Sequence, residues 1–167
     1  KRSKTFGLAT GRTMEPIYAS LVRRLRSWDS DQLDLLLRSW CSFNLDEYVG
    51  LANDNPSSFR NFMKINLADP LGLSVEKLYI PNGKARCLEQ EANDYAKLLE
   101  KYGGISFQLL GLGLNGHLGF NEPPCWSHDS CRVVQLSCST RNQNASSFDG
   151  FADHVPQQAI TLGIAEI

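Results

Sequence analysis

The segment LLGLGLNGHLGFNEP, residues 109–123, carries the pattern that decides the fold. It begins at the end of an apolar run, residues 105–110, which is typical of a buried strand. Four glycines follow, interspersed with Asn115, His117 and Glu122. Glycine lets a backbone turn sharply and approach a ligand closely. A buried strand that ends in such a loop indicates a binding site at the edge of a sheet.

Strands and helices alternate on both sides of this segment. Strands are expected at residues 6–9, 40–45, 77–80, 105–110, 132–136 and 160–162. Helices are expected at residues 15–28, 55–67, 88–99 and 139–148. This alternation predicts an α/β fold with a doubly wound, mostly parallel sheet. No linker divides the sequence, so we expect one domain over residues 1–167.

The first expected helix has an apolar face. Its apolar residues fall on one helical face and are expected to point inward: Ile17, Leu21, Val22, Leu25 and Trp28. Pro16 suits the first helical turn, and Thr13 is a better N-cap than Met14 because its hydroxyl can accept a hydrogen bond.

Composition and charge exclude several classes of protein. The chain is 42% apolar and 21% charged, which is typical of a globular protein, and its net charge of −1 disfavours nucleic acid as a partner. No apolar run approaches the roughly 18 residues that span a membrane. The basic start lacks the apolar core of a signal peptide. We therefore expect a cytoplasmic protein.

The cysteines and histidines raise the question of a metal. The five cysteines have no CxxC pair, and a disulfide framework is not expected in a chain of this class. Cys125, Cys131 and Cys138 lie near His117 and His128, but their spacing matches no closed zinc site. Scattered reduced thiols are the favoured interpretation, with no metal.

Three expected strands end in polar or glycine-rich sequence: Thr10-Gly11-Arg12-Thr13, Asp46-Glu47 and residues 113–122. Ligands of doubly wound sheets bind beyond the carboxyl ends of the strands, so these segments should converge. The first turn precedes a helix, where backbone N–H groups and Arg12 favour a phosphate. A helix start that binds nothing is its simpler alternative.

The side chains at the other two strand ends suit proton transfer. Adjacent strand residues point to opposite sides, so one carboxylate of Asp46 and Glu47 can face a cleft, although a solvated acidic turn is the alternative. His117 titrates near neutral pH, as proton transfer requires. Glu122 is close enough in sequence to hydrogen-bond the imidazole ring and fix its tautomer.

The sequence resembles the glucosamine-6-phosphate deaminase/isomerase family at several motifs. These are Asn44-Leu45-Asp46-Glu47-Tyr48-Val49-Gly50, Gly111-Leu112-Gly113-Leu114-Asn115-Gly116-His117 and Phe120-Asn121-Glu122-Pro123. Leu8-Ala9-Thr10-Gly11-Arg12-Thr13 resembles the family's first phosphate loop, and order and spacing agree from about residue 6 onward.

The resemblance implies a Rossmann-like fold and a cytosolic enzyme that needs neither metal nor organic cofactor. The implied substrate is an amino-sugar 6-phosphate, converted to a ketose 6-phosphate and ammonia. Asp46 matches the base that moves a proton between C2 and C1, and His117 the acid/base of ring opening. Glu122 matches the carboxylate that supports this histidine, and Gly11, Arg12 and Thr13 the phosphate loop.

The sequence departs from the family at several positions. Asn115 stands where glucosamine deaminases usually have Asp, and it resembles the branch assigned to galactosamine 6-phosphate. Ser146 replaces a phosphate-binding Arg, and of the allosteric residues only Arg132 is matched. The family also has a helix before the first strand and further elements beyond Ile167, so we expect a chain truncated at both ends. A homo-oligomer is left open.

Two other functions stay open. The first is hydrolysis by a 6-phosphogluconolactonase-like enzyme, which the resemblance disfavours because that branch usually follows its Gly-His with a Thr-Ala-Ser-Leu-Phe-Pro type of run. Residues 118–123 here are LGFNEP. The second is a catalytically degenerate protein that only binds sugar phosphates, which Asn115 and Ser146 favour.

Overall fold

The computed structural model of the protein describes residues 5–167. The basic residues 1–4, on which part of the signal-peptide expectation rests, lie outside the described residues. The strands are β1 (Phe6–Leu8), β2 (Ser42–Asn44), β3 (Asp46–Tyr48), β4 (Leu78–Tyr79), β5 (Phe107–Gln108), β6 (Arg132–Gln135) and β7 (Gln158–Thr161). The α-helices are α1 (Glu15–Arg26), α2 (Ser30–Ser39), α3 (Phe59–Met63), α4 (Asp69–Leu71), α5 (Leu88–Lys101) and α6 (Cys138–Asn144).

Short helical segments complete the chain. The 3₁₀ turns are η1 (Arg12–Met14), η3 (Val75–Lys77), η4 (Ala145–Ser147) and η5 (Ala152–His154). Between α3 and α4 the segment η2 (Lys64–Ala68) is π-helical.

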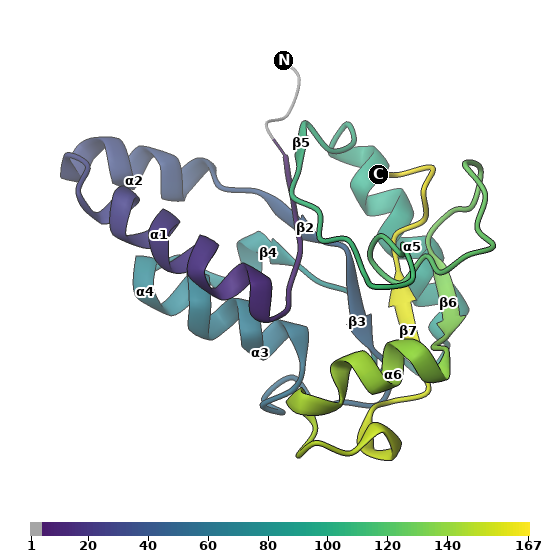
Figure 1. Ribbon diagram of the computed structural model, residues 1–167. Helices are drawn as coiled ribbons and strands as arrows, with labels where there is room; N and C mark the ends of the chain where they lie inside the picture. Colours follow the sequence, from purple (N-terminus) through teal and green to yellow (C-terminus); the bar gives the residue numbers. More distant parts are fainter. Residues whose placement is uncertain (1–4) are drawn as a thin grey trace.

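Four strands form the expected parallel sheet, in the order β4-β2-β1-β5. Helices α1 to α4 lie on one side of it and α5 on the other, so the expected α/β architecture is confirmed (Figure 1). Two tyrosines fix these layers from opposite helices. Tyr18 of α1 donates to the Ala9 carbonyl, and Tyr95 of α5 donates to the carbonyls of Asn44 and Tyr79.

A second, antiparallel sheet has the order β3-β7-β6, which the sequence pattern did not predict. We expected the segments of β6 and β7 to join the parallel sheet. Leu45 connects the two sheets, because its N–H donates to the Leu8 carbonyl and its own carbonyl accepts from the Leu162 N–H. The chain therefore leaves one sheet at Asn44 and enters the other at Asp46.

Helix α1 is rotated relative to its expected buried face. Ile17 and Trp28 are each 44% exposed, whereas Tyr18 is fully buried. The expectation was therefore wrong for both apolar residues, because the tyrosine hydroxyl finds a backbone acceptor inside the core. Of the two cap candidates, Met14 takes the N-cap position of α1 without a side-chain hydrogen bond, and the chemically better Thr13 lies within η1.

The strand at residues 105–110 is shorter and more exposed than expected. Only Phe107 and Gln108 pair with β1, at the edge of the sheet, and Phe107 is 62% exposed. Helix α2 was not expected, and Asp29 caps it by accepting from the Asp31 N–H. The expected helix after Asn55 does form as α3, with Ser58 as its N-cap.

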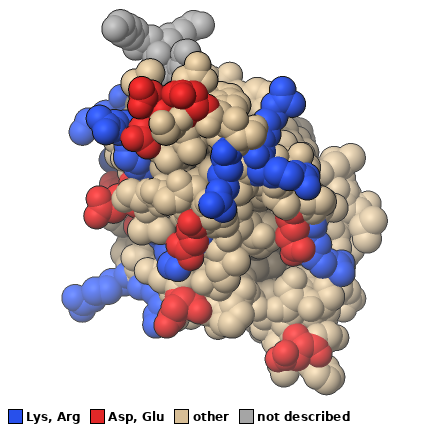
Figure 2. All heavy atoms as spheres, turned by 90° about the vertical axis from the view of Figure 1, so that its left-hand side faces the viewer, with Lys and Arg blue, Asp and Glu red and all other residues tan. Residues whose placement is uncertain are grey.

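Charges of both signs are mixed on the end of the molecule where α1 turns into α2 (Figure 2). The last turn of α1 carries Arg23, Arg24 and Arg26, and the start of α2 carries Asp29 and Asp31. Within residues 5–167, no helix is long and apolar enough to cross a membrane.

Candidate active site

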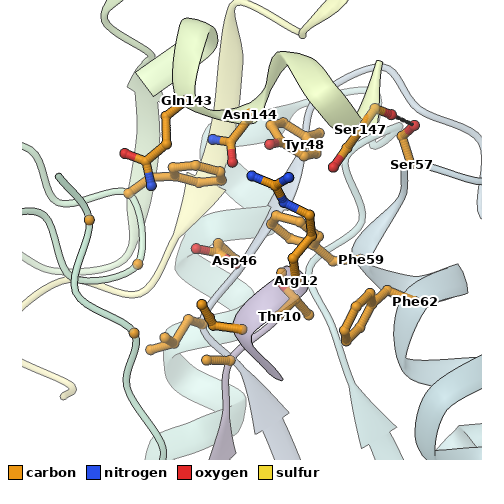
Figure 3. A pocket seen from close by; sticks show the side chains of 18 of the residues that line it. Thr10, Arg12, Asp46, Tyr48, Ser57, Phe59, Phe62, Gln143, Asn144 and Ser147 are labelled. Atoms are coloured by element: carbon orange, nitrogen blue, oxygen red, sulfur yellow. Dashed lines mark hydrogen bonds between the residues drawn. The ribbon is translucent and has the colours of Figure 1, made fainter. Parts of the chain in front are cut away.

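A cavity of ≈ 440 Å³ opens where the two sheets meet. Its walls come from residues 9–15 after β1, residues 45–48 at the start of β3, residues 56–62 around the start of α3, residues 111–120 after β5, and residues 143–147 at the end of α6. The three segments expected to converge therefore line one cavity, and Figure 3 shows Thr10, Arg12 and Asp46 pointing into it.

Asp46 lies on the cavity wall and is only 6% exposed. Burial, and secondarily the charge of Glu47, raise the pKa of the Asp46 carboxyl to about 8. The Oδ2 atom of Asp46 lies near Gly119, because a Cβ added at position 119 would be 3.5 Å from it. The carboxyl group is thus held in a buried position on the cavity wall, where it can take up and release a proton near neutral pH.

Glu47 points away from the cavity and holds the start of α3. Its Oε1 accepts from the N–H groups of Tyr48 at 2.8 Å and Phe59 at 3.0 Å, and its Oε2 accepts from Arg60 N–H at 2.9 Å. The interpretation of these two residues as a solvated acidic turn was wrong, because both are buried in β3. The alternation of the strand separates their environments.

His117 lines the cavity and is 8% exposed. Its Nδ1 lies 2.7 Å from Oδ1 of Asn115, whose Nδ2 donates to Glu122 Oε1 at 3.3 Å. The carboxylate therefore reaches the imidazole through Asn115, and the direct hydrogen bond that we expected from Glu122 is not among the contacts of the described residues. Burial lowers the pKa of His117, and the charge of Glu122 opposes this effect.

Gly113 leaves the space that the His117 ring occupies. A Cβ at position 113 would lie 2.2 Å from Cε1 and 2.3 Å from Nε2 of His117, which real atoms do not tolerate. A Cβ at Gly111 would meet only the Met14 side chain, at an ordinary 3.5 Å. The two glycines thus have different roles, and only Gly113 is required by the histidine.

The turn Thr10–Thr13 forms another wall of the cavity, as expected of an anion-binding loop. Gly11 has φ +101°, which favours glycine, and α1 begins at Glu15. Arg12 makes no ion pair within residues 5–167 and points across the cavity toward Asn144 in Figure 3. Ser146 also lines the cavity, so the side opposite Arg12 carries a neutral side chain at this position.

Thr140 and Ser137 belong to the site but were missed from sequence. Thr140 Oγ1 donates to Glu122 Oε1 and lies 3.5 Å from His117 Nδ1. Ser137 contributes both its N–H, at 3.0 Å, and its hydroxyl, at 2.7 Å, to the same carboxylate. A serine just before an expected helix signals an N-cap, but no local pattern reveals that it binds a carboxylate 15 residues earlier.

Arg132 has a structural role in the loop that follows His117. Its Nη1 donates to Asn121 Oδ1 at 2.8 Å, and Nη2 pairs with Asp129 at 3.4 Å. Asn121 in turn donates to the carbonyls of Leu118 and Leu162. These bonds hold the loop against the end of β7.

The described residues contain no cluster of three or more His, Cys, Asp or Glu side chains that could hold a metal ion. The five cysteines are free thiols there, and burial raises the pKa of Cys131 to about 12. The cavity wall itself carries Asp46, His117 and Arg12, side chains that suit acid–base and anion-binding chemistry.

The fold is shared with known sugar-phosphate enzymes. A 6-phosphogluconolactonase from Thermotoga maritima superposes with a TM-score of 0.68 at 15% identity, covering 98% of this chain and 64% of that one. A monomeric glucosamine-6-phosphate deaminase superposes with a TM-score of 0.90 at 37% identity, covering 100% of this chain and 67% of that one. No protein-family model matches the chain.

Curated relatives define the family. Glucosamine-6-phosphate deaminase of Geobacillus sp. (strain WCH70) is 44% identical over 167 residues, 100% of this chain and 64% of that protein. The enzyme of Lysinibacillus sphaericus (strain C3-41) is 41% identical over 100% of this chain and 68% of its own length. The chain thus spans about two thirds of the relatives it matches. It belongs to the glucosamine-6-phosphate deaminase family.

Proposed function

We propose that the protein is an amino-sugar 6-phosphate deaminase/isomerase. One observation supports this above the others: the Asp46 carboxyl group, His117 and the Thr10–Thr13 loop open into one cavity. The reaction needs a base beside two adjacent carbons, an acid/base at the ring oxygen, and an anchor for the phosphate. The cavity wall offers one candidate for each requirement.

The proposed roles follow the chemistry of the side chains. The Thr10–Thr13 loop and Arg12 bind the phosphate, and His117 moves the proton that opens the sugar ring. Asp46 then takes the proton from C2 and returns it to C1, which converts the open-chain amino aldose to an imine at C2. Water hydrolyses this imine, which releases ammonia and leaves the ketose 6-phosphate.

The proposal also specifies the configuration at C4 of the amino sugar. Asn115 favours galactosamine 6-phosphate by resemblance, whereas the named relatives of 41% and 44% identity are glucosamine-6-phosphate deaminases. We propose glucosamine 6-phosphate as the main substrate, because identity over the whole chain is a broader observation than one position. Residues 5–167 are proposed to act as a single domain.

An ammonia-release assay tests the proposal directly. The protein is incubated with glucosamine 6-phosphate, galactosamine 6-phosphate and, separately, 6-phosphogluconolactone. Ammonia from glucosamine 6-phosphate supports the proposal, and preferential release from the galactosamine epimer would correct the substrate. Lactone hydrolysis without ammonia release would favour the lactonase alternative, and saturable binding with no turnover would favour a degenerate binding protein.

A further inference from the structure

Four side chains link the His117 ring to the start of α6. At their centre, Glu122 Oε1 accepts hydrogen bonds from Asn115 Nδ2, Ser137 Oγ and Thr140 Oγ1. Its Oε2 accepts from Ser137 N–H. Burial raises the pKa of Glu122, but the hydrogen bonds from Thr140, Ser137 and Asn115 outweigh it and lower the pKa. The group is therefore an ionised carboxylate, which only accepts hydrogen bonds.

This acceptor fixes the orientation of the Asn115 amide. Because Glu122 cannot donate, the Nδ2 group of Asn115 must face it, which leaves Oδ1 facing His117 Nδ1 at 2.7 Å. The same Oδ1 also receives the backbone N–H of His117 at 3.3 Å. An amide oxygen only accepts, so the proton of this contact belongs to Nδ1.

The Thr140 hydroxyl also requires that Nδ1 of His117 carries the proton. Its hydroxyl has one proton, which it donates to Glu122, so it presents only a lone pair to His117 Nδ1 at 3.5 Å. Thr140 is 1% exposed, so this hydroxyl is buried. Both groups that face Nδ1 are therefore acceptors.

We propose that Thr140 is a positioning residue which, with Glu122 and Asn115, holds neutral His117 in its Nδ1–H tautomer and leaves Nε2 unprotonated. The importance of Nε2 for ring opening rests on the proposed function. The tautomer itself does not, because it follows from the donors and acceptors of the free protein. Thr140 acts through the ring of His117 and Glu122 and needs no contact with substrate.

The first test is an NMR measurement on the free wild-type protein labelled with ¹⁵N-histidine, above the pKa of His117. Two-bond correlations between ring protons and nitrogens distinguish a protonated from an unprotonated nitrogen. We expect Nδ1 of His117 to be protonated and Nε2 not. The exposed His128 and His154 serve as internal references. A His117 in the Nε2–H form would overturn the proposal.

The second test compares variants of α6. Thr140→Val keeps the shape but removes the hydroxyl, so His117 should become a mixture of tautomers. The kcat should fall about 10-fold, less than the roughly 10²-fold expected when an acid–base group itself is lost. Thr140→Ser should restore both properties to within about twofold. Ser139→Ala, at the exposed neighbouring position, is the matched control. A wild-type tautomer and kcat in Thr140→Val would overturn the role of Thr140.

Glu122→Gln decides the matter if Thr140→Val does not fold. Glutamine has nearly the shape of glutamate but can donate, so it allows the Asn115 amide to turn its Nδ2 toward His117. The ring should then shift toward Nε2–H, and an unchanged tautomer would overturn the proposal. These spectra need no substrate, so their outcome is separate from the ammonia assay that tests the proposed function.

Discussion

Asp46 and Glu47 are consecutive carboxylates with opposite effects on the stability of the fold. Glu47 satisfies three backbone N–H groups, whereas among the described contacts the Asp46 carboxyl group has no hydrogen bond, and its pKa is raised from 3.8 to about 8. Above pH 4 an unfolded chain releases the Asp46 proton, but the folded chain retains it until about pH 8. As pH rises over this range, the unfolded chain gives up the Asp46 proton more readily than the folded chain does, so the free energy of unfolding falls.

Asp46→Asn should therefore be inactive but more stable. Turnover should fall by at least ~10²-fold because the proposed base is lost. The free energy of unfolding should exceed that of the wild type by an amount that grows between pH 4 and pH 8, reaching on the order of a few kcal/mol. Urea unfolding at several pH values, together with ammonia release, measures both effects.

Glu47→Gln is the control, with the opposite sign of stability change. Its amide cannot accept all three N–H groups, so at least one is left without a partner, at a cost of about 1–3 kcal/mol. Near-normal turnover in Asp46→Asn would remove Asp46 from its proposed role. A lower free energy of unfolding in Asp46→Asn than in the wild type would contradict the conclusion that burial of the ionised Asp46 carboxylate is unfavourable.

The contact between Gly113 and His117 gives a second prediction at this scale. Gly113→Ala places a methyl group where the imidazole lies, so the ring must shift from the position in which it contacts Asn115. Turnover should fall by roughly 10²-fold, the scale of one lost acid–base group, with the protein still folded. Gly111→Ala, whose Cβ meets only Met14, should stay within about twofold of wild type. Equal losses in both variants would indicate a general effect on the loop.

At the scale of elements, the sequence predicted the parallel strands and the loops at their ends. It could do so because the apolar runs are short and are interrupted by glycine or polar residues. It did not predict that Ser42–Asn44 and Asp46–Tyr48 belong to different sheets, since no glycine or proline marks Leu45. That break depends on Leu8 and Leu162, which are distant in sequence and bond the two sides of Leu45.

The site could be predicted to a similar extent. Asp46, His117 and the Thr10–Thr13 loop could be placed at one edge because strand ends meet there. The relay from Glu122 to His117 could not, because it depends on Thr140 and Ser137 from α6. Likewise, a rotation of α1 by about 100°, the angle between adjacent residues, exchanges Ile17 for Tyr18 on the buried face, and helical periodicity alone tolerates this difference.

The loop before α1 gives the prediction for an element. Arg12 lies at the cavity without a carboxylate partner in residues 5–167, so it should bind a phosphate group. Inorganic phosphate should compete with substrate, and Arg12→Ala should weaken this inhibition about 10-fold, an effect that shrinks as salt rises. Arg26→Ala, at the far end of α1, is the matched control. Absence of competition would leave the loop as a helix start only.

At the scale of the whole molecule, the cavity depends on both sheets. The Thr10–Thr13 loop follows β1 of the parallel sheet, Asp46 begins β3 of the antiparallel sheet, and residues 111–120 cross between them. Leu45 holds the two sheets in register through its two backbone hydrogen bonds. A ligand that fills the cavity should therefore stabilise segments that are far apart in the sequence.

Hydrogen exchange can distinguish a complete site from an isolated anion-binding loop. Inorganic phosphate should slow exchange at residues 10–15 only, because it reaches no further than the loop. Fructose 6-phosphate, the product expected from glucosamine 6-phosphate, should also slow exchange at residues 111–119, where its carbons would lie beside His117. At 100 times its Kd it should raise the free energy of unfolding by about 2.7 kcal/mol. Arg12→Ala should reduce protection of both segments at a fixed ligand concentration, since the phosphate anchors the sugar. Protection by fructose 6-phosphate that stays confined to residues 10–15 would mean that the cavity does not bind the sugar and its phosphate together.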